Sequence, residues 1–496
     1  MRCPRPRRAA PGVRRIVALH HYDSPVPSRT RRTTFPRYEF GPKPKRRTEL
    51  GLLLFGSLLI VALYVIAELG AKSKIPANLG PFLGMVLGLS LVAHMANRWL
   101  IPHANAVILP LAALLNGIGY VIIGRWNPPY ARQQAGWAAL GIVLYVVTLL
   151  VVRYSRDLER YRYLLLLAAG LLLAAPLFFS PINGARLWVR VGWVQFQPIE
   201  FSKILLVIFF ASYFAENKEV LSIPTARLGN RLVLDPRPLI PLLVAWGAAM
   251  GVIGLEGDIG FAALLFTIFM AMLWITTGRF GYLLFGAILF AVGAYVSARY
   301  FGQVHHRVDE WLDPWQTATN PNTGGGQLRL GEYGFAAGGV GGTGLGFDVA
   351  AGSIPFVTTD MIFAAIGTEM GLVGAAAVVI AYVLMVGSGF RIAQTARSDF
   401  SRLMAAGFTM IIGFQAFFIM AGVVRLLPFT GITLPFVAYG GSSLLANYIL
   451  IALLLRISDE GAQAQSLMRQ AGAAGSPGET LMVPASPGVP SRRGAG

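Results

Sequence analysis

The sequence has 496 residues, of which 55% are hydrophobic and only 13% are charged. Soluble proteins carry about a quarter charged residues, so this composition excludes a large soluble globular protein. The single cysteine, Cys3, excludes an internal disulfide framework, and no spacing of Cys and His resembles a zinc site.

Residues 1–48 form a strongly basic segment with several prolines and no apolar run, and they carry much of the net charge of +19. Such a segment cannot bury enough apolar surface to fold, so we expect a disordered cytoplasmic arm attracted to anionic lipid headgroups. No motif supports a nucleic-acid partner. Residues 459–496 are rich in Ala, Gly, Pro and Ser, which predicts a flexible cytoplasmic tail.

Between these ends, apolar stretches of about 20 residues recur, the length that a helix needs to cross a bilayer core. We therefore predict an all-α polytopic membrane protein with about 12 transmembrane helices. The predicted spans are roughly 50–69, 79–97, 104–124, 136–153, 162–180, 200–215, 239–255, 260–277, 281–300, 361–387, 404–424 and 435–455.

Arg and Lys gather in the connections on one side of the predicted bundle, and cytoplasmic loops carry this excess. With an even number of spans, both termini are then cytoplasmic. Two long connections, about 181–199 and 301–360, fall outside. The second is too long for a simple connector, and we expect an irregular, close-packed loop over an outward-facing cavity.

The first outer connection alternates apolar, aromatic and cationic residues, as an interfacial segment does. Arg186 is placed to meet phosphates at the outer headgroup level, although snorkelling beside an aromatic belt that includes Trp188 would give the same pattern. Glu200 and Lys203, three residues apart at a helix start, share a face and can pair. Because a lysine facing lipid is expensive, we expect Lys203 to point into a polar cavity.

Two acidic residues stand at predicted outer helix ends. Asp258 lies in a tight turn between two spans, where it either N-caps the following helix or belongs to a functional site. Asp360 lies between a long Gly-rich segment and a long apolar run. A carboxylate at the mouth of a membrane helix is costly to desolvate, so Asp360 indicates chemistry, with an N-cap as the alternative.

The glycines within 324–346 resemble a nucleotide cradle only weakly. No Gly-Lys-Ser/Thr sequence follows them, no strand precedes them, and they fall on the outer side of the membrane, so we expect no nucleotide.

Farther along, two prolines and a Gly-Gly-Ser-Ser cluster stand at an outer helix entrance. Irregular backbone at membrane depth is tolerated only where it lines a cavity or is covered by protein. We expect Ser442 and Ser443 to offer hydrogen-bond donors there, although neither has the partners of a nucleophilic serine.

At this point the sequence resembles the SEDS family of polytopic peptidoglycan polymerases, whose members include RodA, FtsW and SpoVE. Its signatures match in order: Gly184-Ala185-Arg186 with Trp188; Gln197-Pro198 with Glu200 and Lys203; Asp258-Ile259-Gly260; Arg307, Asp313-Pro314 and Gln327 up to Thr359-Asp360; and Leu434-Pro435-Phe436 with Tyr439-Gly440-Gly441-Ser442-Ser443.

The resemblance covers roughly 104–458, and the run Pro428-Phe429-Thr430-Gly431 is more similar to RodA than to FtsW. It assigns 101–458 to a SEDS-like catalytic core of ten helices and 49–100 to two additional N-terminal helices. Phe356 and Thr358 stand where many members have Glu and His, which removes possible metal ligands or proton relays beside Asp360.

The resemblance implies a peptidoglycan glycosyltransferase that polymerises undecaprenyl-linked lipid II at the outer face of the bacterial cytoplasmic membrane, for elongation or division. The 4-hydroxyl of the acceptor attacks the anomeric carbon of the donor, and undecaprenyl diphosphate leaves. The hydroxyl needs a base, for which Asp360 is our candidate. The diphosphate needs positive charge, for which Arg186, Lys203 and a divalent cation such as Mg²⁺ or Mn²⁺ are candidates.

The resemblance also implies a class B penicillin-binding protein as partner. Two other classes of function stay open, a transporter that flips lipid II and a non-catalytic scaffold of a cell-wall complex.

The remaining candidates are substrate-binding residues Glu200, Gln197, Gln327, Ser442 and Ser443, and structural or cavity residues Asp258, Trp188 and Glu369.

Overall fold

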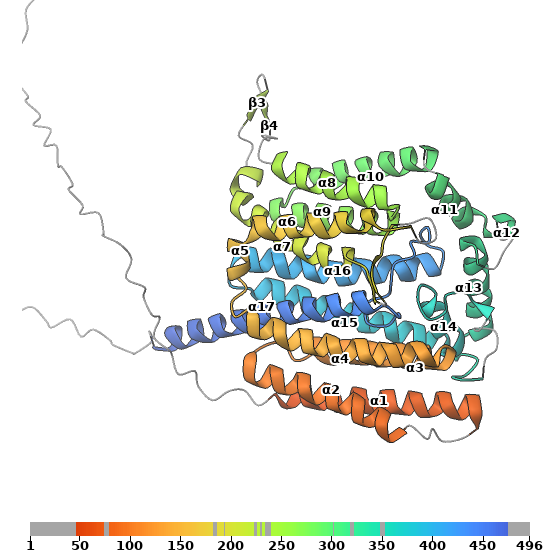
Figure 1. The fold of residues 1–496 in the computed structure, drawn as a ribbon. Helices are drawn as coiled ribbons and strands as arrows, with labels where there is room; N and C mark the ends of the chain where they lie inside the picture. Colours follow the sequence, from red (N-terminus) through yellow and green to blue (C-terminus); the bar gives the residue numbers. More distant parts are fainter. Residues whose placement is uncertain are drawn as a thin grey trace, which may run out of the picture. The chain divides into compact units, whose positions relative to one another are not determined.

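The computed structural model describes residues 46–73, 79–181, 186–192, 194–222, 226–228, 231–233, 240–300, 302–317, 322–347 and 353–474. Nearly all of the predicted basic arm lies outside these residues, although Arg47 already begins the first helix. The described residues are mainly helical (Figure 1). Their strands form two short antiparallel hairpins, β1 (Val189–Val191) with β2 (Val194–Phe196), and β3 (Ala226–Leu228) with β4 (Arg231–Val233).

The helices of the first half lie within the described residues 47–256. They are α1 (Arg47–Lys72), α2 (Leu79–Leu100), α3 (Ile108–Trp126), α4 (Pro128–Val151), α5 (Asp157–Arg160), α6 (Arg162–Ala174) with the 3₁₀ turn η1 (Ala175–Phe178), α7 (Ile199–Ser222) and α8 (Ile240–Glu256).

The helices of the second half lie within the described residues 259–474. They are α9 (Ile259–Thr277), α10 (Phe280–Tyr300), α11 (Gly302–Leu312), α12 (Pro314–Thr317), α13 (Gly324–Gly338), α14 (Ile362–Glu369), α15 (Gly371–Thr395), α16 (Asp399–Val423) and α17 (Gly441–Ala474).

Eight helices in the described part of the chain are long and apolar enough to cross a membrane, namely α1, α2, α3, α4, α9, α15, α16 and α17. Shorter apolar helices occupy 162–178, 243–256 and 280–296. Together with α7, these helices overlap every predicted span, although the span predicted at 361–387 is divided at Met370 into the short helix α14 and the long helix α15. The prediction of an all-α polytopic membrane protein is therefore confirmed.

Local sequence explains where several helices begin. The side chain of Asn127 accepts a hydrogen bond from Tyr130 N, and Pro128 follows it at the first helical position of α4. Ser398 caps α16 and Thr323 caps α13 in the same way. These contacts satisfy amide groups that a helix start otherwise leaves without partners.

The expectation of an irregular loop over 301–360 was wrong, because α11, α12 and α13 occupy most of its described residues. The glycines near 324 start α13, and Gly338 at its end lets the helix touch α14. A methyl group at Gly338 would lie 2.2 Å from Gly367 O. Glycine therefore serves close helix packing here.

The last helix also differs from its prediction, because α17 continues to Ala474 and the first part of the expected tail is helical. Asp459 accepts a hydrogen bond from His103 N at 2.7 Å, and Glu460 accepts one from Ser155 N at 2.6 Å. Both carboxylates thus fix the extension of α17 to the connections that precede α3 and α5.

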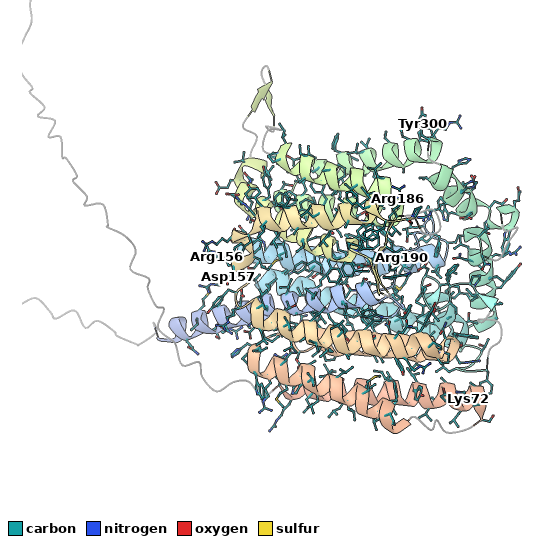
Figure 2. The ribbon with its side chains drawn as sticks, in the orientation of Figure 1. Lys72, Arg156, Asp157, Arg186, Arg190 and Tyr300 are labelled. Atoms are coloured by element: carbon teal, nitrogen blue, oxygen red, sulfur yellow. The ribbon has the colours of Figure 1, made fainter. Side chains whose placement is uncertain are left out.

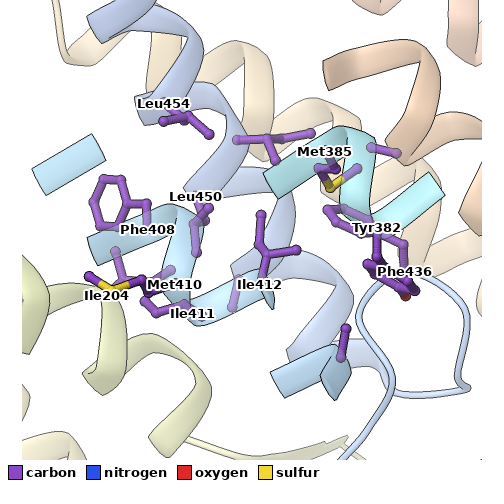
Figure 3. Packing of buried hydrophobic residues seen from close by; sticks show 14 of the residues in the cluster. Ile204, Tyr382, Met385, Phe408, Met410, Ile411, Ile412, Phe436, Leu450 and Leu454 are labelled. Carbon is purple, nitrogen blue, oxygen red and sulfur yellow. The ribbon is translucent and has the colours of Figure 1, made fainter. Parts of the chain in front are cut away.

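Much of the hydrophobic core lies around α16 and α17, and Figure 3 shows part of it. Phe408, Ile411 and Ile412 of α16 are almost completely buried, and so is Leu450 of α17. Helix α7 packs against α16, α9 and α6, while α17 packs against α4. Any polar side chain on the inward faces of α7 or α16 must therefore find its partner inside the protein.

The two N-terminal helices are attached to the rest of the bundle by packing and by a buried polar cluster. Helix α1 packs on α3, and α2 packs on α4. Glu49 pairs with Arg46 and accepts hydrogen bonds from His94 Nδ1 at 2.9 Å and from Asn97 at 3.3 Å. Tyr145 of α4 donates to Asn97.

Candidate active site

Asp360 lies in the turn that precedes α14, and its side chain is half-buried. Helix α14 begins at Ile362 with Met361 as its N-cap residue, so the N-cap alternative for Asp360 was wrong. Tyr439 N donates to Thr358 O at 2.9 Å and holds this turn against the segment before α17. Phe356 in the same turn adopts a left-handed conformation with φ 55°, which costs about 1–3 kcal/mol for a bulky residue.

The carboxylate of Asp360 faces Gly431, because a methyl group placed on that glycine would lie 3.9 Å from Asp360 Oδ2. Across the described residues, no side chain or backbone group donates a hydrogen bond to this carboxylate. A half-buried acid of this kind is available to a substrate hydroxyl.

Asp258 caps α9 by accepting a hydrogen bond from Phe261 N at 3.0 Å. The capping alternative is therefore confirmed, and the side chain is 6% exposed. Its turn packs on the same segment that faces Asp360, because a methyl group at Gly260 would lie 2.8 Å from Thr430 O. The segment Thr430–Ile432 thus lies between the two acids.

Arg307 completes this group of charges. It lies half-buried on α11, and its Nη1 donates to Thr430 O at 3.3 Å. The sequence signatures included Arg307, but it was not chosen as a site residue. The signal available in the sequence was that Arg307 is a cation in the outer connection that precedes Asp360, the candidate base.

Burial raises the pKa of Asp360 to about 7; the positive charge of Arg307 opposes this shift and the negative charge of Asp258 adds to it. Burial likewise raises the pKa of Asp258 to about 6, against the hydrogen bond from Phe261 N and the charge of Arg307. Near neutral pH, Asp360 can therefore both accept and release a proton, which suits a general base.

Lys203 lines a cavity of only about 10 Å³ whose other lining residues are apolar, such as Leu206 and Phe261, so the expectation of a polar cavity was wrong. The side chain is almost completely buried, pairs with Glu200, and donates to Gln415 Oε1 at 2.6 Å. Its Nζ also lies 5.6 Å from the centre of the Phe261 ring. These partners replace water around the ammonium group of Lys203.

The pair Glu200–Lys203 supports the segment near the active-site turn. Gln415 Nε2 donates to Thr433 O at 2.9 Å, and Thr433 Oγ1 donates to Ser443 Oγ at 2.9 Å. Gln415 was not predicted, although a glutamine inside the apolar run of a membrane span is a usable signal.

Gln197 and Ser442 are brought together, because Gln197 N donates to Ser442 Oγ at 3.0 Å. Gln327 is buried in the first turn of α13, where its Nε2 donates to Asn322 O at 3.1 Å. Glu369 is buried at the end of α14, and its Oε2 accepts a hydrogen bond from Gly346 N at 3.4 Å.

Arg186 and Arg190 are both exposed, and Figure 2 labels them toward the same end of the helices. Arg186 N donates to Glu256 O at 3.0 Å, which ties this segment to the end of α8 near Asp258. Trp188 is half-buried just before β1. Gly184 and Ala185 of the same signature lie outside the described residues.

Comparisons with known proteins agree with this arrangement. The profile of the family described as "Cell cycle protein", FtsW/RodA/SpoVE, matches residues 122–463. The peptidoglycan glycosyltransferase RodA of Mycobacterium tuberculosis H37Rv is 38% identical over 432 residues, covering 84% of this chain and 91% of the relative. The probable peptidoglycan glycosyltransferase FtsW of the same strain is 30% identical over 376 residues, covering 73% and 69%.

A solved chain from work on polymerization and crosslinking by a peptidoglycan synthase complex is also similar. It is 26% identical with a TM-score of 0.59, and the match covers 73% of this chain and 99% of that one. The higher identity to RodA than to FtsW agrees with the sequence signatures. The chain therefore belongs to the FtsW/RodA/SpoVE family.

Proposed function

We propose that this protein is a peptidoglycan glycosyltransferase, of the RodA type, that polymerises lipid II. The names of its relatives support the reaction class. The observation that carries the proposal is the half-buried carboxylate of Asp360, which accepts no hydrogen bond from the described residues and lies beside Gly431. A transporter needs no such base.

In the proposed reaction, Asp360 takes the proton of the acceptor's 4-hydroxyl as its oxygen forms a bond to the donor's anomeric carbon. The bond from that carbon to the diphosphate oxygen breaks, and its electron pair leaves with undecaprenyl diphosphate. Arg307 and the exposed Arg186 supply positive charge for the developing negative charge. Because Lys203 is buried and paired, we assign it to positioning the 433–443 segment rather than to binding phosphate.

We propose that a divalent cation, Mg²⁺ or Mn²⁺, binds only when the substrate is also bound. Over the described residues, no three His, Cys, Asp or Glu side chains form a group that could hold a metal. Mg²⁺ is commonly bound by one or two carboxylates plus substrate phosphates. Asp258 and Asp360 could supply such carboxylates, and the cation would neutralise charge on the diphosphate.

We further propose the bacterial cytoplasmic membrane as location, with both termini cytoplasmic and the Asp360 side facing out. Figure 2 places Arg156 and Asp157 at one end of the helices, and Lys72, Arg186 and Arg190 toward the other. The predicted excess of Arg and Lys in the connections of the first end supports this orientation. The synthase complex among the similar structures supports a class B penicillin-binding protein as partner.

The deciding experiment gives lipid II to the purified protein in detergent, where no second compartment exists. We expect glycan chains from the wild type and from Glu332→Gln, a half-buried acid elsewhere in the outer region, and none from Asp360→Ala. Reactions with added chelator test whether the cation is required. Reactions with the penicillin-binding protein added test the effect of the complex.

Failure of the wild type to make polymer in every arm would favour a flippase. Full polymerisation by Asp360→Ala would remove the base assignment. A scaffold predicts that Asp360→Asn keeps the cellular phenotype of the wild type.

A further inference from the structure

Helices α1 and α2 lie outside the part of the chain that the family profile matches, residues 122–463. The end of α1 nevertheless contacts a segment that follows α13. A methyl group at Gly70 would lie 2.2 Å from Leu345 O, and a methyl group at Gly346 would lie 2.2 Å from Ala67 O. Leu345 and Gly346 are buried. Glycine therefore allows the backbone of α1 to touch this segment directly.

The segment 343–346 that α1 contacts is also bonded to the end of α14. Thr343 N donates to Thr368 O at 3.0 Å, and Gly344 N donates to Glu369 O at 3.1 Å. These bonds satisfy carbonyl groups that the end of a helix otherwise leaves without partners. The segment therefore connects the end of α1 to the end of α14.

Arg125, near the end of α3, holds the same segment from a third side. Its Nη2 donates to Gly346 O at 3.0 Å, and its guanidinium group lies 4.6 Å from the centre of the Trp126 ring. Gly346 N donates to Glu369 Oε2 at 3.4 Å. Gly346 thus contacts α1 through its backbone, α3 through Arg125 and α14 through Glu369.

Helix α14 connects this contact to the Asp360 turn. All eight residues of α14 are buried, and Met361 N, directly before the helix, donates to Phe356 O at 3.2 Å within the turn. A helix of this length is about 12 Å long. Because a densely packed interior transmits strain, a displacement at the Glu369 end of α14 would also move its other end.

We propose that α1 is a positioning element for the reaction. Through Gly70 and Ala67 it holds the 343–346 segment against the end of α14, and α14 in turn fixes the carboxylate of Asp360 opposite Gly431. The inference rests on the proposed function, since it takes Asp360 as the base. Gly70 is then a positioning residue that affects the rate without contacting the substrate.

The first test measures hydrogen–deuterium exchange in the purified full-length protein without substrate. Gly70→Ala places a methyl group against Leu345 O, whereas Gly51→Ala adds the same group to α1 where nothing lies within 4 Å. We expect amide exchange in 343–346 and in 356–361 to accelerate about tenfold in Gly70→Ala and to stay as in the wild type in Gly51→Ala.

Exchange is measured without catalysis, so its result stands even where the wild type makes no polymer and the proposed function fails. Unchanged exchange in Gly70→Ala would overturn the proposal. Acceleration confined to 343–346 would also overturn it, because α14 would then not transmit the displacement to the Asp360 turn.

The second test is the rate of polymerisation. In Gly70→Ala we expect kcat to fall about fivefold or more, while KM and the midpoint of thermal unfolding stay close to those of the wild type. Gly51→Ala should match the wild type in all three quantities. A lower unfolding midpoint with an unchanged kcat per folded molecule would show that the contact serves stability alone, which contradicts the proposal.

Arg125→Gln releases the 343–346 segment from α3 and leaves α1 unaltered. We expect it to accelerate exchange in 356–361 and to lower kcat, and failure to do so would overturn the proposal whatever the result with Gly70→Ala. Because both substitutions act through Gly346, the double variant should lose less kcat than the product of the two single losses. Losses that multiply would mean that α1 and the segment act independently, against the proposal.

Discussion

Two carboxylates of this protein, those of Glu49 and Asp360, differ in whether their hydrogen-bond partners lie inside the protein. Glu49, in the first turn of α1, is completely buried and has Arg46, His94 and Asn97 as partners. Asp360, before α14, is half-buried and accepts no hydrogen bond in the part of the chain that the structure describes. A carboxylate with all its partners inside the protein holds structure together, whereas one whose partners are missing is available to a substrate.

The largest expected effect tests the unpartnered acid. Asp360→Asn keeps the size of the side chain but cannot accept the proton, so we expect the polymerisation rate to fall by about 10²–10⁴-fold. Because no hydrogen bond to this carboxylate is lost, the midpoint of thermal unfolding should stay close to that of the wild type. A rate within a few-fold of wild type would show that another group is the base.

The comparison of paired and unpaired carboxylates also applies to Glu200, whose carboxylate is paired with the buried side chain of Lys203. Lys203→Met leaves the carboxylate without its cation, and breaking a buried pair costs about 3–5 kcal/mol. We therefore expect a large drop in the unfolding midpoint in detergent. The double variant Glu200→Gln/Lys203→Met should regain much of that stability, since neither charge is then buried alone. No recovery would mean that packing around Phe261, rather than charge, sets the loss.

These cases also show what sequence could predict. The membrane spans followed from hydropathy, and the Glu200–Lys203 pair followed from their spacing of three residues. The third partner, Gln415, lies 212 residues beyond Lys203, and no local pattern connects the two positions. A contact of this range depends on how α7 and α16 pack.

The outer region was harder to predict for a different reason. The glycines of 324–346 indicated a loop, but Thr323 caps a helix there and Gly338 packs against α14. Likewise, the approach of Thr430 to Gly260 and of Gly431 to Asp360 depends on positions where a side chain would collide or strain the backbone. A sequence shows that a residue is glycine, but not which neighbour requires it.

The fully paired acid should give a smaller effect than Lys203→Met. In Glu49→Gln the neutral side chain keeps the size of the original, but Arg46 loses its counter-charge. Arg46 still donates to Ile101 O, so we expect a loss of about 2 kcal/mol in the free energy of unfolding. Polymerisation per folded molecule should be unchanged. A rate loss at full stability would place this cluster in the reaction and contradict the contrast with Asp360.

The smallest expected effect concerns pH, and its sign follows from the neighbours of Asp360. A base works when deprotonated, so with a pKa of about 7 the value of kcat/KM should fall about tenfold per pH unit below pH 7 and level off above it. Asp258→Asn, which can still cap α9, removes a negative charge and lowers the pKa of Asp360, so the acid limb should move to lower pH. Arg307→Met removes a positive charge and should move the limb to higher pH. The charge arrangement around Thr430 requires that the acid limb shifts in opposite directions in the two variants and does not shift in Glu332→Gln. Shifts of the limb in the same direction would exclude Asp360 as the group that titrates.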